Sequence, residues 1–126
     1  MKTKYSLILP SFNELENLKL LIPQIRTALK KKKYEIILVD DNSEDKTIPE
    51  LKKFFKGINN IKYFLRKKNR SLGLSIKKGI KNSKGTAVIV MDSDFNHRPE
   101  DLKKMLKIFE KNKIDMICGS RFLQGG

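Results

Sequence analysis

Five short apolar runs alternate with longer amphipathic stretches along the chain. The runs are YSLIL at 5–9, EIILV at 35–39, IKYFL at 61–65, AVIVM at 87–91 and DMIC at 115–118. They are rich in branched and aromatic residues, and several lack the alternation of a half-exposed strand, so they predict strands buried on both faces. Apolar residues at helical spacing predict helices between them, around 15–29, 51–55, 74–80 and 102–109.

The alternation of strands and helices predicts an α/β fold. We expect one domain over residues 1–126, with a mostly parallel sheet, helices on both faces and right-handed crossovers. Pro23 conflicts with one unbroken helix over the first amphipathic stretch. We therefore expect either a kink at Pro23 or a helix that begins near it.

Polar or glycine-bearing sequence follows every predicted strand. These segments are PSFNE, DDNSEDKT, RKKNRSLG, DSDFNHRPED and GSRF, in chain order. Turns and helix caps favour the same residue types, which accounts for one or two such segments by chance. Ligands of open α/β sheets bind outside the carboxyl ends of the strands. Five polar strand ends therefore predict one continuous binding rim.

Two aspartates follow the apolar run at 87–91. In an extended segment the side chains of Asp92 and Asp94 point the same way, and their carboxylates repel each other unless a cation lies between them. Mg²⁺ or Mn²⁺ prefers oxygen ligands and is usually held by one or two carboxylates together with phosphate oxygens. The alternative is that Asp94 only caps the next helix.

Other rim residues suit a nucleoside diphosphate. Asp41 ends the second predicted strand beside Asp40, and either carboxylate can accept hydrogen bonds from a ribose or a base, which Glu14 can flank. Basic residues at 66–70 can neutralise phosphates or lie in a solvated loop. Arg121 offers a planar fork that fits phosphate.

Charge narrows the possible partners. The formal net charge is +14, and residues 51–126 carry nineteen basic and six acidic side chains. Such an excess can mark nucleic acid, an anionic membrane or phosphorylated substrates, and it is equally typical of lysine-rich solvated helices. The chain has no nucleic-acid-binding motif, and an acidic rim would repel a phosphate backbone, so we expect no nucleic-acid partner.

Cysteine content and hydropathy bear on localisation. Cys118 is the single cysteine, which excludes an internal disulfide. The sequence has no apolar run long enough to span a bilayer. We expect a cytoplasmic protein, peripheral at an anionic membrane if the basic residues reach it.

The ordered motifs resemble the inverting family 2 glycosyltransferases of the dolichyl-phosphate mannosyltransferase type. The matching segments are LPSFNELENL, EIILVDDNSEDKT, LGLS with GIKNSKG, VIVMDSDFNHRPED, and GSRF with GG. The resemblance implies a GT-A fold and an inverting transfer of a hexose, such as mannose from GDP-mannose, to a polyprenyl or dolichyl phosphate. It also implies a divalent metal, Mg²⁺ or Mn²⁺.

The resemblance also assigns site residues. Those matching donor-binding positions are Pro10, Phe12, Glu14, Val39, Asp41, Asp92, Ser93 and Asp94, with Arg121 at a phosphate-binding position. Those matching metal-binding positions are Asp92, Asp94 and Asn96. Asp92 and Asp94 would carry the catalytic role through the metal. Phe12 stands where tyrosine is commoner, and Ser75 replaces a frequent glycine.

Family members continue well past the last matching motif, so we expect a chain truncated at its C-terminus. It would hold the donor site and little of the acceptor site. The alternatives are a nucleotide-sugar-binding domain without turnover, another donor of the UDP-glucose type, or a sugar hydroxyl as acceptor.

Overall fold

The computed structural model describes residues 4–92, 99–112 and 116–118. Strands and helices alternate in the predicted order: β1 Lys4–Ser11, α1 Leu15–Leu29, β2 Lys33–Asp40, α2 Thr47–Phe54, β3 Ile61–Leu65, α3 Leu72–Lys81, β4 Ala87–Val90, α4 Pro99–Asn112 and β5 Met116–Cys118. Within these residues, no helix is long and apolar enough to cross a membrane.

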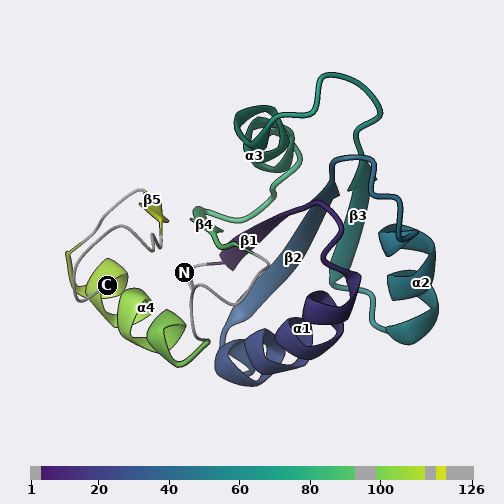
Figure 1. The fold of residues 1–126 in the computed structure, drawn as a ribbon. Helices are drawn as coiled ribbons and strands as arrows, with labels where there is room; N and C mark the ends of the chain where they lie inside the picture. The colour runs from purple at the N-terminus through teal and green to yellow at the C-terminus, as the bar shows by residue number, and fades with distance from the viewer. Residues whose placement is uncertain (1–3, 93–98, 113–115, 119–126) are drawn as a thin grey trace.

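All five strands join one sheet in the order β3-β2-β1-β4-β5 (Figure 1). Every pair of neighbours is parallel. The predicted parallel α/β fold is therefore confirmed. Residues of β1 and β2 are buried on both faces of the sheet, which explains why their apolar runs do not alternate with polar residues.

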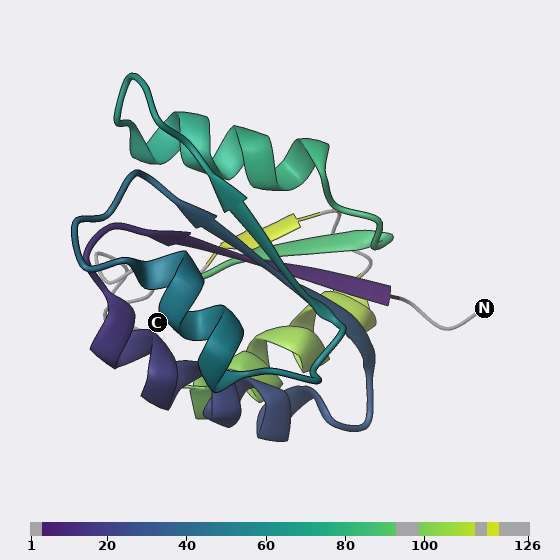
Figure 2. The same ribbon diagram turned by 90° about the vertical axis from the view of Figure 1, so that its right-hand side faces the viewer.

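Helices cover both faces of the sheet. Figure 2 shows α1, α2 and α4 on one face and α3 on the other. The larger core lies under the three helices, where side chains of α1 pack against Leu7, Leu9 and Ile36 of the sheet. On the opposite face, Ile8 belongs to a smaller core against which Ile76 of α3 packs.

The first three crossovers share one hand and the last has the opposite hand. From β1 to β3 the chain moves toward one edge of the sheet with α1 and α2 on the same face. It returns to β4 with α3 on the other face, which preserves the hand. It then continues in the same direction to β5, yet α4 lies on the face of α1. The prediction of right-handed crossovers throughout is therefore wrong: Leu102 and Leu106 join the larger core and hold α4 there.

Pro23 lies inside α1, which begins at Leu15 and ends at Leu29. The alternative of a helix that begins near Pro23 is therefore wrong. Proline has no N–H to donate to the carbonyl four residues earlier. The helix nevertheless continues because its apolar stripe is held in the core, with Ile22 and Ile25 on either side of Pro23 fully buried.

A close approach of helix to sheet occurs at Gly79. A Cβ placed there would lie 2.6 Å from Cγ2 of Ile8 in β1. Only glycine allows α3 to approach so near, because real Cβ contacts are longer. Ser75 is one turn earlier on the same side of α3 and is buried as well. The contact at Gly79 therefore also sets the position of Ser75 over the end of β1.

A buried carboxylate binds three neighbours at the amino ends of the strands. Oε2 of Glu35 accepts hydrogen bonds from Ser6 Oγ at 2.5 Å and from the backbone N–H of Lys84 at 2.6 Å. Oε1 pairs with Lys62 Nζ at 2.8 Å. Burial alone would raise the pKa of Glu35, but these partners favour the charged form and lower it from 4.5 to about 2.

Candidate functional site

A pocket of about 240 Å³ lies where the carboxyl ends of β1 and β2 meet the start of α3. Six of its lining residues come from three of the polar segments that follow the strands, and the seventh, Ser75, comes from α3; the seven are Pro10, Ser11, Phe12, Asp41, Arg70, Leu72 and Ser75. The structure therefore brings together Pro10, Phe12 and Asp41, which lie far apart in the sequence. The segments that follow β1, β2 and β3 thus meet in one pocket, as the predicted rim requires at these three strands.

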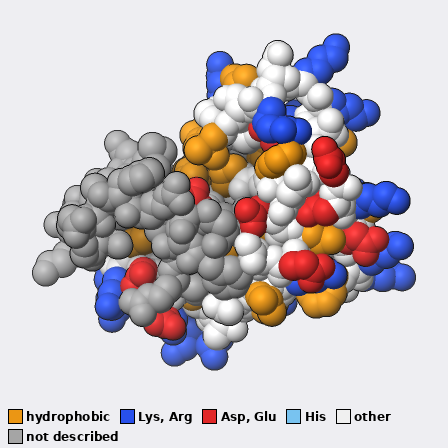
Figure 3. All heavy atoms as spheres, in the orientation of Figure 1, with side chains coloured by type: hydrophobic (Ala, Val, Ile, Leu, Met, Phe, Trp, Pro, Cys, Tyr) orange, Lys and Arg blue, Asp and Glu red, His pale blue; other side chains and the backbone are white. Residues whose placement is uncertain are grey.

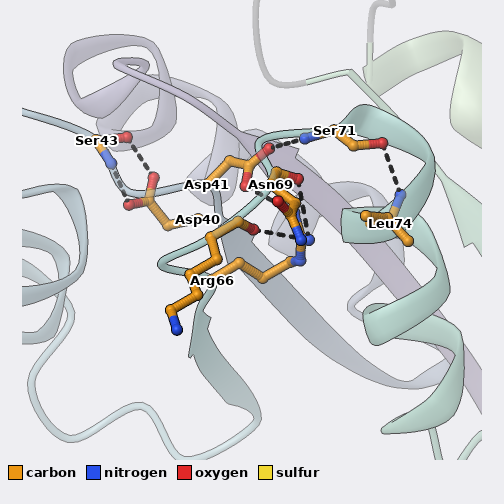
Figure 4. Close-up of polar contacts among 8 residues, drawn as sticks. Asp40, Asp41, Ser43, Arg66, Asn69, Ser71 and Leu74 are labelled. Carbon is orange, nitrogen blue, oxygen red and sulfur yellow. Dashed lines mark hydrogen bonds and ion pairs between the residues drawn. The ribbon is translucent and has the colours of Figure 1, made fainter.

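Asp41 is fixed by two charge-assisted contacts (Figure 4). Its Oδ1 lies 2.8 Å from Nη1 of Arg66, and its Oδ2 accepts a hydrogen bond from the backbone N–H of Ser71 at 2.8 Å. The side chain is 8% exposed. Each carboxylate oxygen has a second lone pair, so Asp41 keeps capacity to accept a hydrogen bond from a ligand.

Arg66 stabilises the loop before α3 through hydrogen bonds to its backbone. Its Nη2 donates to the carbonyl oxygens of Lys68 and Asn69, both at 3.2 Å. Asn69 has a φ of 56°, a left-handed conformation that asparagine tolerates better than most residues. The guanidinium predicted as a phosphate partner is thus bound to Asp41 and to its own loop, which positions Ser71 and the start of α3.

Asp40 has a structural role in the turn after β2. Oδ2 of Asp40 accepts from the backbone N–H of Ser43 at 2.9 Å, and Oδ1 accepts from the Ser43 hydroxyl. Between them Asn42 has a φ of 63°. Asp40 is not among the residues that line the pocket. Of the two adjacent aspartates proposed for ribose or base, Asp41 is the one in the pocket.

An exposed arginine covers the aromatic ring of the first motif. The guanidinium carbon of Arg70 lies 3.6 Å from the ring centroid of Phe12, a distance typical of a stacked cation–π contact. Phe12 is half-buried and lines the pocket. A flat ligand that stacks on Phe12 must therefore displace Arg70 or lie beside it.

Asp92 is the second residue after β4, which ends at Val90, and its side chain is half-buried. Because β4 pairs with β1, it lies at the carboxyl end of the sheet, like the pocket. Ser93, Asp94, Asn96 and Arg121 lie outside the described residues. Within residues 4–92, 99–112 and 116–118, no three Asp, Glu, His or Cys side chains form a group that could hold a metal.

Glu14 and Val39 are not among the residues that line the pocket. Glu14 is the residue before α1, and its Oε2 accepts a hydrogen bond from Asn17 Nδ2 at 2.6 Å. Val39 is fully buried in the smaller core. The contribution of either side chain to ligand binding stays a prediction.

Figure 3 views the molecule from the carboxyl ends of the strands. In the coloured part of this face, Asp and Glu side chains lie across the middle, and most Lys and Arg side chains lie toward the outline. The basic excess is therefore spread around the site more than concentrated in it. An acidic centre suits a bound cation better than a bare polyanion.

Two features of the pocket were not anticipated from the sequence. The first is the pairing of Asp41 with Arg66. The second is that the hydroxyls of Ser11 and Ser75 are buried without a hydrogen-bond partner among the described residues. The spacing of Ser75 and Gly79, two small residues four apart in a helix, was the available signal that this side of α3 packs closely.

The chain matches the family described as Glycosyl transferase family 2 over residues 6–126. It is 37% identical over 123 residues to a dolichol-phosphate mannosyltransferase of Pyrococcus furiosus, covering 98% of this chain and 34% of the relative. It is 30% identical over 128 residues to a dolichol-phosphate mannosyltransferase of Saccharomyces cerevisiae, covering 99% of this chain and 47% of the relative. It thus spans about a third to a half of the length of these curated relatives.

A solved structure shares the fold. It is the mannosyltransferase PcManGT from Pyrobaculum calidifontis in complex with GDP-Man and Mn²⁺, with a TM-score of 0.76. The sequences are 16% identical, and the match covers 90% of this chain and 34% of that protein. This likeness confirms the GT-A-like architecture predicted from the motifs.

Proposed function

Because the chain belongs to glycosyl transferase family 2, we propose that it binds the nucleotide-sugar donor of an inverting transferase that moves a hexose to a polyprenyl phosphate. Mannose from GDP-mannose is the donor we favour, since curated relatives at 30% and 37% identity are named dolichol-phosphate mannosyltransferases. The observation that carries the proposal is the pocket that joins Pro10, Phe12 and Asp41 at the carboxyl ends of β1 and β2.

The pocket has the chemistry of a nucleoside site. Phe12 offers an aromatic face, and Asp41 offers an oriented carboxylate that can accept from a ribose hydroxyl or a base N–H. Asp41 has its position fixed by Arg66 and Ser71 before any ligand arrives. A preformed acceptor loses little conformational entropy on binding, which favours affinity.

Asp92 suits one end of a metal site, as a half-buried carboxylate at the carboxyl end of β4. We propose that Asp92 and Asp94 hold Mg²⁺ or Mn²⁺ with help from Asn96. A bound metal would supply positive charge to the departing diphosphate. The role of this chain is then to orient the donor, with the nucleoside in the pocket and its diphosphate directed toward the end of β4.

A polyprenyl phosphate needs no strong base from the protein. Its phosphate oxygen is already ionised near neutral pH, because the second pKa of a phosphate monoester is about 6. A sugar hydroxyl would require a general base to remove its proton. The named relatives favour the phosphate acceptor, and we expect contact with the surface of the membrane that contains it.

The experiment that tests the donor proposal is calorimetric titration with GDP-mannose and GDP in the presence of Mn²⁺. Asp41→Asn keeps the shape of the side chain and removes its charge. We expect it to weaken both ligands alike, because both carry the nucleoside that Asp41 would contact. A change confined to the sugar-bearing ligand would show that Asp41 does not bind the nucleoside.

A second candidate is nucleotide-sugar binding without turnover. The observation that favours it is that the chain spans 34% and 47% of the two curated relatives. Donor binding alone does not align two reactants for attack. Product analysis with GDP-mannose and a polyprenyl phosphate separates the candidates, since a binding domain would bind the donor and form no glycolipid.

A further inference from the structure

Two buried serine hydroxyls in the pocket wall have no hydrogen-bond partner within the described part of the chain. Ser11 is 4% exposed and Ser75 is 1% exposed, and both line the pocket. Leaving a buried polar group unpaired is unfavourable, so most such groups in proteins are hydrogen-bonded. Two orphaned hydroxyls in one small pocket are therefore unusual and require an explanation.

The backbone around each hydroxyl is held firmly by other contacts. The N–H of Ser75 donates to the carbonyl of Ser71 at 3.0 Å, and the carbonyl of Ser11 accepts from the N–H of Asp41 at 2.9 Å. A helical serine can satisfy its hydroxyl on the carbonyl four residues earlier, but the Ser75 hydroxyl makes no such bond in this structure. The close contact of Gly79 with Ile8 fixes that side of α3 against β1.

The hydroxyls complete a set of groups suited to a heteroaromatic ring. Phe12 supplies a flat apolar face, Asp41 supplies an acceptor, and the two hydroxyls can each donate or accept at a ring edge. A purely apolar ligand would leave both hydroxyls unpaired. We propose that Ser75, with Ser11, hydrogen-bonds the polar edge of the donor's nucleobase and that Ser75 determines base preference, an inference that rests on the proposed function.

A buried hydroxyl that is paired only when ligand is bound improves binding but lowers the stability of the ligand-free protein. Replacing Ser75 with alanine removes the orphaned hydroxyl and inserts a better helix former. Ser75→Ala should therefore raise the thermal midpoint by about 3 °C or more and weaken binding of the preferred nucleoside diphosphate. A serine that only supports the fold would lower the midpoint when replaced.

The experiment compares wild type, Ser75→Ala and Ser11→Ala, with Ser83→Ala as the control because the Ser83 hydroxyl is already bonded to the Ile80 carbonyl. Each protein is titrated with GDP, UDP and ribose 5-diphosphate in Mn²⁺, and its thermal midpoint is measured. We expect Ser75→Ala to bind the preferred nucleotide about 5- to 30-fold more weakly, corresponding to one unpaired hydrogen bond. Binding of ribose 5-diphosphate and the behaviour of Ser83→Ala should be unchanged.

The possible outcomes separate the two claims. Unchanged nucleotide affinity in Ser75→Ala, or equal losses for GDP, UDP and ribose 5-diphosphate, would overturn the base contact and leave donor binding intact. A lowered thermal midpoint would assign Ser75 a structural role instead. A wild-type protein that binds none of the three ligands would overturn both the base contact and the proposed function.

Discussion

Acid should weaken this fold through Glu35. Its pKa is lowered from 4.5 to about 2 in the folded protein, so the folded state favours the charged carboxylate more than the unfolded chain does. The stabilisation is present above pH 4.5 and is lost as pH falls toward 2. Each pKa unit corresponds to 1.36 kcal/mol, so the full contribution is about 3 kcal/mol, of which about 2 kcal/mol is lost by pH 3.

The assay is urea denaturation of wild type and Glu35→Gln between pH 7 and pH 3. Glutamine keeps an oxygen that can accept from Ser6 and Lys84, but it cannot pair as an anion with Lys62. We expect the variant to be less stable at pH 7 and the stability difference to shrink by about 2 kcal/mol at pH 3. A difference that stays constant over this range would refute the assignment of the low pKa to Glu35.

Three further predictions concern packing, the site and the surface. Gly79→Ala should lower the free energy of unfolding by about 1 to 3 kcal/mol by overpacking against Ile8. Gly73→Ala is the control and should not lower it, because a Cβ there would have its nearest neighbouring atom at 3.8 Å. The midpoints of urea denaturation of the two variants test this difference. Arg66→Ala should lower the free energy of unfolding by about 1.5 to 3 kcal/mol by leaving the buried Asp41 carboxylate without its counter-ion, and an unchanged urea midpoint would show the ion pair to be unimportant. Co-sedimentation with phosphatidylserine vesicles should fade as salt rises, and salt-resistant binding would indicate apolar insertion instead.

The apolar pattern was sufficient to predict the order of strands and helices. A buried parallel strand and an amphipathic helix each need a local pattern of apolar residues, and that pattern is written in the sequence. The hand of the last crossover was not predictable in this way, because it depends on which core receives Leu102 and Leu106 of α4. The continuation of α1 past Pro23 was not predictable for a related reason, since the burial of α1 outweighs the loss of one helical hydrogen bond.

The site was predictable only in part. The strand-end motifs predicted a shared rim, and the pocket does join Pro10, Phe12 and Asp41. The pairing of Asp41 with Arg66 joins residues 25 apart, and nothing in local sequence chooses Arg66 over the neighbouring basic residues. Unpaired hydroxyls cannot be predicted from a motif at all, because their state depends on every atom packed around them.

Donor binding through a metal can be tested by calorimetry with GDP-mannose, first with Mn²⁺ and then with excess EDTA. We expect binding with Mn²⁺, a marked loss of affinity in EDTA, and the same loss in Asp92→Asn even when Mn²⁺ is present. Equal affinity under all three conditions would contradict the metal site at the end of β4. No binding under any of them would contradict the donor-binding function itself.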